Sequence, residues 1–283
     1  MPSAKIRIVT DTTSALPLEY AHAHRIEVVP QIINFGTESY LEGVTLDYVE
    51  FIRRLKVAPQ LPKTAAPQPG DLIEAYRKQL ADAPTILSIH PSAEVSGTVR
   101  SALTAKNDAF PDADIRVLDS RLVGGNLASM VIAATEWAER GVGIEKIVMR
   151  LQRMIPRGRL YFLVATLEYL QRGGRIGGAS ALIGTALQIK PILELKNGRV
   201  EPLEKVRTYH HALARLKELA IEQCPRSPDA HLCVMHADDR AGAEQLAKDF
   251  QSALKIGDIP IYLCSASITT HAGPGALGVG FFV

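Results

Sequence analysis

Cysteine is scarce in this sequence of 283 residues, which has only Cys224, Cys233 and Cys264. Their number is odd, and their spacing fits no set of metal ligands. A disulfide-stabilised secreted protein usually has an even number of closely spaced cysteines. We therefore expect buried or incidental thiols, no structural disulfide and no metal site, as is typical of a reducing cytoplasm.

Long hydrophobic runs and a strong excess of charge are also missing. No stretch of about 18 apolar residues occurs, so no transmembrane helix is predicted. The first residues, MPSAKIRIVTDTTS, lead directly into an expected strand and leave no room for a signal peptide. A net charge of +2 is small for a protein that coats DNA. We expect a cytoplasmic protein that does not bind nucleic acid.

Common catalytic motifs are absent as well. The sequence has no GxSxG elbow for a nucleophilic serine and no GxxxxGK[ST] loop for nucleotide phosphates. Asp11 follows the first expected strand but has no second acid nearby to hold Mg²⁺. Asp119 and Ser120 follow another strand without a positioned base. The sequence favours a site that binds an oxyanion without breaking a bond, so we predict no catalytic residue and no cofactor.

Apolar residues, in contrast, make up 47% of the chain, which is enough for a substantial core. In the first half, apolar strands alternate with helical patterns, which predicts a parallel sheet with helices on its faces. In the second half, Asn197-Gly198 separates two strand patterns and predicts a hairpin, so this sheet is mixed. We predict an α/β fold of two domains, a parallel-sheet domain of residues 1–158 and a mixed-sheet domain of residues 159–283.

The starts of two helices in the first half are predicted from their caps. Asp71 is expected to begin the helix LIEAYRKQL, after a rigid loop that is rich in proline. Thr45 is expected to cap the helix LDYVEFIRRLK. The predicted apolar face of this second helix consists of Leu46, Val49, Ile52 and Leu55.

The stretch ASALIGTALQI, residues 179–189, is unusual because a helix of this sequence is apolar over most of its circumference. Such a helix must be buried in protein or cover something apolar. Arg172 and Arg175 precede it around a Gly-Gly turn, and Lys205 and Arg207 follow it. One interpretation is a wall beside a ligand or partner site that is partly apolar and partly anionic. The alternative is that these four residues are solvated surface charges.

The loop that follows the strand TILSIH contains Ser92, Ser96 and Gly97 just before the next helix. In parallel α/β proteins, ligands bind beyond the carboxyl ends of the strands. Glycine permits close approach of the backbone, and free N–H groups at a helix start attract anions. All three residues are therefore candidates for ligand binding. The alternative is that Ser96 only caps the helix.

Two further candidates lie far from this loop in the sequence. Thr64 occupies the proline-stiffened segment KTAAPQPG, where its hydroxyl is a pre-positioned donor. His271 lies in ITTHAGPGALG, where glycines and a proline bend the backbone and allow the imidazole to face a ligand carboxylate. The alternatives are a surface threonine and a structural histidine.

Several motifs occur in the order IRIVTDTTSALP, PKT with its following prolines, VSGTVRSA, VLDS, LEYLQRGGRI, KPIL with NGRVEPLEKVR, and THAGPGALG. With this order and spacing, the chain resembles the DegV family of bacterial fatty-acid-binding proteins over essentially its whole length. The resemblance implies two α/β domains with a long-chain fatty acid between them. It also implies the carrier subunit of a fatty acid kinase system, which contacts membranes transiently and presents the carboxylate to a separate kinase. The acyl-phosphate made there feeds phospholipid synthesis.

By this resemblance, Thr64 and Ser96 hydrogen-bond the carboxylate of the fatty acid, and His271 lies close to it. Arg175 and Arg207 match basic residues that face the kinase or the acyl-phosphate. The sequence departs from the family pattern near Ser96, where Ala93 replaces a serine and Val99 replaces an aromatic residue.

Two other functions are compatible with the same residues. One is an enzyme that processes small acyl or phosphate esters through Ser96 or Asp11. The other is a regulatory interaction protein whose lipid is structural. An enzyme of this kind would turn over substrate without a partner, whereas the carrier needs a kinase.

Overall fold

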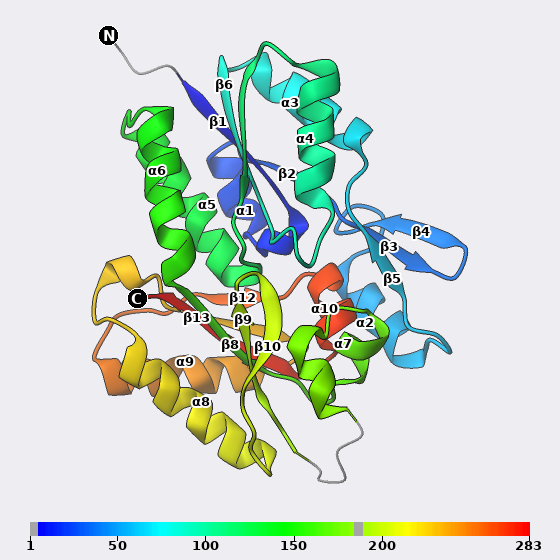
Figure 1. Cartoon of the computed structure of the whole chain (residues 1–283), viewed down its shortest axis with the longest axis vertical. Helices are drawn as coiled ribbons and strands as arrows, with labels where there is room; N and C mark the ends of the chain where they lie inside the picture. Colours follow the sequence, from blue (N-terminus) through cyan, green and yellow to red (C-terminus); the bar gives the residue numbers. More distant parts are fainter. Residues whose placement is uncertain (1–4, 184–188) are drawn as a thin grey trace.

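The computed structural model describes residues 5–183 and 189–283. Its first sheet is parallel, as predicted from the alternation of strands and helices. The order of its strands is β2 (Glu27–Val29), β1 (Ile6–Asp11), β6 (Thr85–His90) and β7 (Asp114–Asp119). Helices cover both faces of this sheet, namely α3 (Pro69–Leu80) and α4 (Thr98–Ala109) on one and α5 (Gly124–Glu139) on the other (Figure 1).

The alternation of side chains along each strand explains why both faces are covered. Successive residues of a strand point to opposite faces. On β1, Ile8 belongs to the core on the α5 side and Val9 to the core on the α3 side. On β6, Leu87 belongs to the core on the α5 side and Ile86 to the core on the α3 side. Both faces therefore bury apolar area, and each needs a helix layer.

The second sheet is mixed, as the sequence predicts. Its strand order is β10 (Arg199–Glu204), β9 (Ile192–Lys196), β8 (Gly158–Leu163), β13 (Ala276–Phe282), β11 (Cys233–Ala237) and β12 (Ile261–Leu263). The β9–β10 hairpin turns at Asn197 and Gly198, which both have positive φ, as a two-residue hairpin turn requires. The outer face of the sheet is covered by α8 (Tyr209–Gln223) and α9 (Arg240–Leu254).

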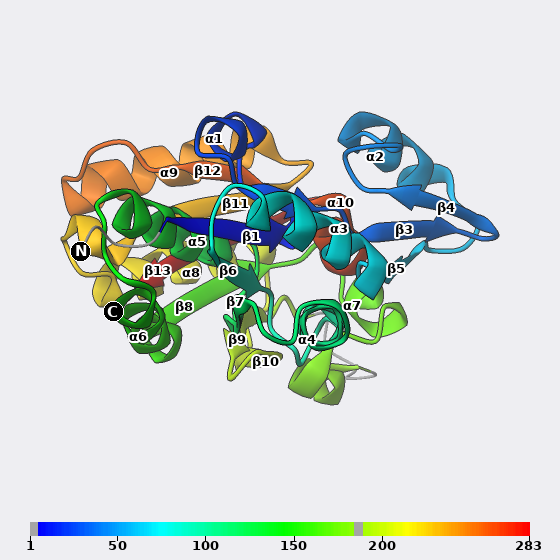
Figure 2. The same ribbon diagram turned by 90° about the horizontal axis from the view of Figure 1, so that it is seen from above.

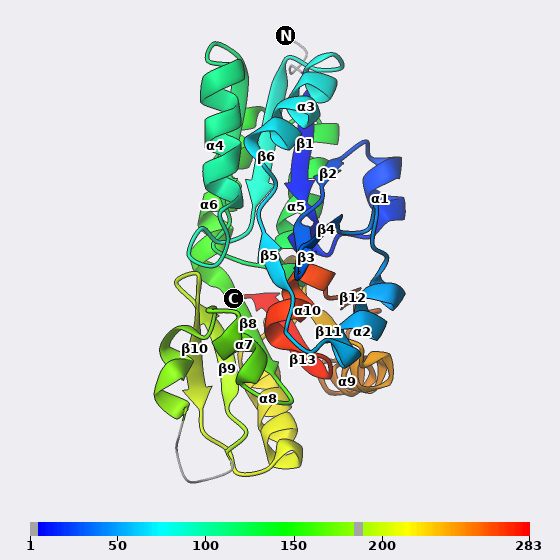
Figure 3. The ribbon, with the colours of Figure 1, turned by 90° about the vertical axis from the view of Figure 1, so that its right-hand side faces the viewer.

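Helix α5 joins the two sheets, because it contacts β1 and β6 of the first sheet and β8, β11 and β13 of the second. It is almost entirely buried. With α6 (Ile144–Met154) packed beside it, α5 lies between the first sheet, in the upper half of the molecule, and the second sheet, in the lower half (Figures 1 and 3). Within the described ranges, no helix has the length and hydropathy needed to cross a bilayer.

A small third sheet projects from the side of these layers and was not predicted (Figure 2). It consists of β4 (Glu38–Leu41), β3 (Ile32–Phe35) and β5 (Lys63–Ala65). Pro30 and Gln31 separate β3 from β2, so the apolar segment IEVVPQIINF forms two strands in two sheets. Helices α2 (Tyr48–Val57) and α10 (Ala266–Ala272) pack against each other beside this sheet.

The predicted helix starts need correction. Asp47 caps α2 by accepting the backbone N–H of Glu50, whereas Thr45 accepts the N–H of Leu41 in the preceding turn. Val49 is 80% exposed because the buried face of α2 is rotated toward Phe51, Ile52 and Leu55. Helix α3 begins at Pro69 rather than Asp71, which lies in its first turn and accepts the N–H of Gln68.

The helix predicted for residues 179–189 also differs from the structure in its described part. Residues Gly177–Leu182 form a short 3-10 helix, and residues 184–188 lie outside the described part of the chain. Ala179 and Leu182 are buried in the main hydrophobic core. The other short helices are α1 (Leu18–Ala23), α7 (Glu168–Arg172) and the 3-10 turns Thr12–Ser14, Ile155–Arg157 and Pro228–Ala230.

Candidate functional site

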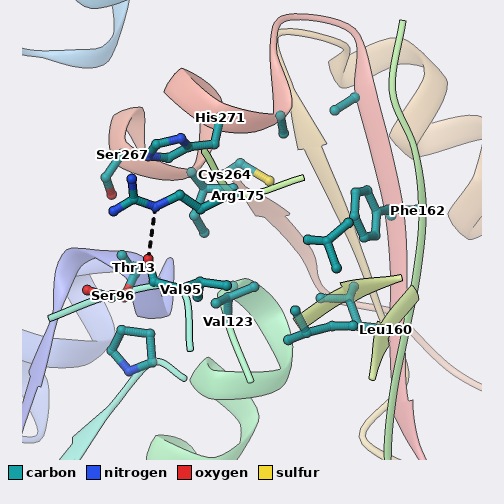
Figure 4. Close-up of a pocket in the computed structure, with 18 of the residues that line it drawn as sticks. Thr13, Val95, Ser96, Val123, Leu160, Phe162, Arg175, Cys264, Ser267 and His271 are labelled. Atoms are coloured by element: carbon teal, nitrogen blue, oxygen red, sulfur yellow. Dashed lines mark hydrogen bonds between the residues drawn. The ribbon is translucent and has the colours of Figure 1, made fainter. Parts of the chain in front are cut away.

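A cavity of about 1050 Å³, including its open mouth, lies where the first sheet's loops meet the second sheet. The cavity is apolar along most of its length. Its apolar lining includes Val95, Val123, Leu160, Phe162, Leu170, Leu195, Val200, Met235, Ile268, Ala272, Ala276 and Leu277. Leu160 and Phe162 come from β8 and lie away from the polar end (Figure 4).

The polar end of the cavity brings together residues that are far apart in the sequence. Thr64 comes from β5, Ser96 from the loop before α4, and His271 from α10. The Thr64 Oγ1 atom lies 2.8 Å from Nε2 of His271. The three ligand-binding candidates therefore line one end of one cavity.

His271 is neutral at physiological pH. Burial lowers its pKa to about 4, and the positive charge of Arg175 contributes to the same shift. A neutral imidazole has one N–H, and among the described residues Nδ1 is buried without a hydrogen-bond partner. An orphaned N–H is rarer than an orphaned acceptor, so the geometry favours a proton on Nε2, which donates to Thr64. The Thr64 hydroxyl is then free to donate into the cavity.

Arg175 lines the same end of the cavity, closer to the site than the sequence implied. Its Nε donates to the carbonyl of Val95 at 3.1 Å, and its Nη1 to the carbonyl of Gly173 at 2.8 Å. Figure 4 shows the first of these contacts, with Arg175 beside His271. Both acceptors are uncharged carbonyls, so they hold the guanidinium without neutralising its charge. The polar end therefore suits an anion.

The remaining candidates lie at different places. Gly97 lines the cavity and immediately precedes α4. Ser92 is fully buried outside the cavity lining, and its hydroxyl donates to the carbonyl of Gly198 at 2.9 Å. It connects the loop after β6 to the β9–β10 turn. Arg207 is exposed after β10 and is also outside the lining.

The described residues of the apolar stretch, 179–183 and 189, do not line the cavity either. Ala179 and Leu182 are buried against protein, so their lack of charge is explained by core packing. The cavity wall comes instead from strands of the second sheet and from α10.

Thr13, Gln31 and Ser267 also line the polar end, and the sequence reasoning did not select them as binding residues. Thr13 belongs to the polar run after β1, which was a recognisable signal. Gln31 lies between β2 and β3, after Pro30, and Ser267 lies in the first turn of α10. No local pattern marks either of them, because their place depends on how distant segments pack.

The cavity has no activated nucleophile among the described residues. Ser96 Oγ lies 2.8 Å from the Thr98 hydroxyl, and the neighbouring His271 is paired with Thr64. Burial raises the pKa of the Cys264 thiol to about 12, which keeps it protonated. Asp11 is fully buried and is not part of the cavity lining. This chemistry does not favour an esterase or phosphoesterase that acts through Ser96 or Asp11.

Gly173 leaves the space that His271 occupies. A methyl group at Gly173 would overlap Nδ1 of His271, although the backbone there has an ordinary φ of -76°. We expect Gly173→Ala to push the imidazole away from Thr64 and into the open cavity. The pKa of His271 should then rise from about 4 toward its ordinary value, since burial holds it down. Titration of the imidazole signals by NMR measures this change.

The adjacent glycine is the matched control. Gly174 has a φ of +69°, and an added methyl group would meet nothing within 4 Å. Gly174→Ala should cost about 1 kcal/mol of stability through backbone strain and leave the pKa of His271 at about 4. Equal effects of the two substitutions on this pKa would contradict the proposed contact.

The fold and the cavity define an α/β protein with a binding site suited to a molecule that has a long apolar body and an anionic end. Comparison of the sequence and the fold with those of known proteins assigns the chain to a family. A family described as "Uncharacterised protein, DegV family" matches residues 5–283, and the chain belongs to the DegV family.

Relatives are similar over their full length. A DegV domain-containing protein of Streptomyces coelicolor is 37% identical, with 98% of each chain covered. DegV of Bacillus subtilis, a fatty acid binding protein, superposes with a TM-score of 0.89 at 32% identity, covering 99% of this chain and 100% of that one. A DegV family protein of Thermus thermophilus, described for its fatty acid binding, gives a TM-score of 0.90 at 31% identity, with 98% and 99% covered.

Proposed function

We propose that this protein binds one long-chain fatty acid in the cavity, with the carboxylate at Thr64, Ser96 and His271. One observation carries the proposal: a largely apolar cavity has one polar end, where the hydroxyls of Thr64 and Ser96 lie with an imidazole and a guanidinium. The fatty acid binding of the related Bacillus subtilis and Thermus thermophilus proteins supports it. In this function the protein is a carrier and needs no cofactor.

The energetics are adequate for extracting a lipid from a membrane. Burial of one methylene is worth about 0.8 kcal/mol, so a chain of about 16 carbons contributes on the order of 10 kcal/mol before ordering costs. Burial of an unpaired carboxylate would offset much of this favourable free energy, because an unpaired buried charge is very costly. Donors from Thr64, Ser96 and the start of α4 offset that cost.

The proposal extends to a partner. The two main sheets form two domains, residues 1–158 and 159–283, and the fatty acid lies in a tunnel between them. A separate kinase transfers the γ-phosphoryl group of ATP to the carboxylate, which yields ADP and an acyl-phosphate for phospholipid synthesis. Arg175 faces the phosphate and Arg207, which is exposed, faces the kinase. The carrier works in the cytoplasm and touches the membrane surface transiently to exchange its lipid.

Native mass spectrometry of the purified protein tests the binding step. We expect an adduct with the mass of a fatty acid, and about tenfold or greater loss of retention for Thr64→Ala or Ser96→Ala, because each removes a charge-assisted hydrogen bond. Ser252→Ala, which removes an exposed hydroxyl on α9, is the control and should retain the adduct.

Two outcomes would contradict the proposal. A folded wild-type protein that carries no fatty acid after incubation with one would remove the binding function. Hydrolysis of acyl or phosphate esters without any partner, lost in Ser96→Ala while lipid stays bound, would favour the enzyme instead. Addition of a fatty acid kinase and ATP then tests for formation of acyl-phosphate.

A further inference from the structure

A chain of buried polar residues runs beneath the polar end of the cavity. Asp11 and His90 have no exposed surface, and Asp11 Oδ2 lies 2.7 Å from His90 Nδ1. His90 Nε2 lies 2.7 Å from the hydroxyl of Ser88, which accepts a hydrogen bond from Tyr76 at 2.9 Å. Burial of polar groups costs free energy unless each is hydrogen-bonded, so the positions of these four side chains are strongly determined.

Asp11 determines how the amide of Gln31 is oriented. Asp11 Oδ1 accepts the backbone N–H of Thr13 at 3.0 Å and the Nε2 of Gln31 at 3.0 Å. A carboxylate only accepts, so the nitrogen of the Gln31 amide must face it. The same nitrogen lies 2.9 Å from Thr98 Oγ1. The two hydrogens of this NH₂ group therefore go to Asp11 and Thr98.

The orientation of the Gln31 amide also determines which group donates in the hydrogen bond between Thr98 and Ser96. Thr98 is fully buried and accepts from Gln31, and its own hydrogen has one acceptor among the described residues, Ser96 Oγ at 2.8 Å. Ser96 Oγ also accepts the backbone N–H of Thr98 at 3.3 Å. Both lone pairs of Ser96 are then occupied, and its only free group is its O–H. In the cavity, Ser96 can donate a hydrogen bond but cannot accept one.

We infer that Gln31 and Thr98, held by Asp11 and His90, are positioning residues that make Ser96 an obligatory donor. They thereby select lipids with an acceptor-only carboxylate over lipids with a hydroxyl that must donate. The inference rests on the proposed function, since it concerns the head group of the same ligand. It assigns a role to Thr98, Asp11 and His90, which lie outside the cavity lining and act on the lipid head group through Ser96, whereas Gln31 also lines the cavity itself.

Gln31→Glu reverses the direction of the bonds with almost no change of shape. A protonated carboxyl oxygen in place of the Gln31 Nε2 donates its one hydrogen to Asp11 and accepts from Thr98; an ionised carboxylate also accepts from Thr98. Thr98 then no longer donates to Ser96, so Ser96 donates to Thr98 instead. A lone pair of Ser96 now faces the cavity, where it repels a carboxylate and accepts from an alcohol.

Competition between palmitic acid and hexadecanol measures this selectivity. Each purified protein is incubated with an equimolar mixture, and the bound lipid is extracted and quantified by mass spectrometry. We expect the wild type to retain the acid, and the ratio of acid to alcohol to fall about tenfold or more in Gln31→Glu. An unchanged ratio in a folded variant overturns the inference while the proposed function stands. A wild type that binds neither lipid overturns both.

Because Gln31 lines the cavity, an ionised carboxylate in Gln31→Glu also repels a fatty acid directly, so a second pair of variants acts at Thr98, outside the lining. This pair also covers the case in which Gln31→Glu does not fold. Thr98→Val keeps the size of the side chain and removes its hydroxyl, so Ser96 is no longer fixed as a donor and the ratio should fall. Thr98→Ser restores the hydroxyl and should restore the ratio. A structural role for Thr98 alone would lower the retention of both lipids equally and leave the ratio unchanged, which would also overturn the inference.

Discussion

Replacement of Ala272 by phenylalanine should leave the protein folded but unable to retain a fatty acid. Ala272 is partly exposed at the end of α10 and lines the cavity. A phenyl ring there occupies space that the acyl chain needs, at a small side chain that is partly exposed at the edge of the core. Exclusion of about half of a long chain removes on the order of 5 kcal/mol of methylene burial, equivalent to more than a thousandfold loss of affinity.

Native mass spectrometry and thermal unfolding together test this expectation. Ala272→Ser keeps the cavity open and should retain lipid. Ala241→Phe adds the same ring to an exposed position on α9 and controls for a general effect of an added aromatic residue. If Ala272→Phe binds fatty acid as the wild type does, the lipid occupies a place other than this cavity, and the proposed site is wrong.

The main sheets were predictable because their signals are local. The alternation of apolar strands and helices predicted the parallel sheet, and Asn197-Gly198 predicted the hairpin through the positive φ angles that both residues adopt. Such signals act within about ten residues of the chain.

The third sheet was not predictable in the same way. Its strands have three or four residues each, which is too short to show a period of two. The exposure of Val49 was not predictable either. Four apolar residues at helical spacing are compatible with two slightly different orientations of α2 about its axis. Contacts with β3 and α10 determined which rotation buries Phe51 instead.

The binding candidates Thr64, Ser96 and His271 came from motif shape and family resemblance, and the structure brings them to one cavity end. Their supporting residues had no such signal. His90 contacts Asp11 across 79 positions of sequence, and Gln31 contacts Thr98 across 67. Each is an ordinary polar residue without a distinctive local motif. Only the packing of parallel strands makes them neighbours, so single-sequence reasoning had no basis for pairing them.

Asp11→Ala should be the most destabilising of the substitutions considered. Asp11 has no exposed surface and accepts hydrogen bonds from Thr13 and Gln31 while its other oxygen contacts His90. Its removal leaves several buried donors without an acceptor. Breaking a buried pair by removal of one partner typically costs about 3–5 kcal/mol, so we expect a loss of this size in the free energy of unfolding.

Urea unfolding of the variants measures this loss, with Asp112→Ala, at an exposed position, as the control that should change stability little. His90→Phe tests the pair in a double-mutant cycle. If the two groups stabilise each other, the double variant should be less destabilised than the sum of the single variants, by roughly 1–3 kcal/mol. Additive effects would mean that the 2.7 Å contact contributes little and that Asp11 acts mainly through Gln31 and Thr13. The contact of Asp11 with Gln31 leads through Thr98 to Ser96. The two outcomes therefore distinguish a role of Asp11 in the stability of the fold from a role in orienting the Ser96 hydroxyl.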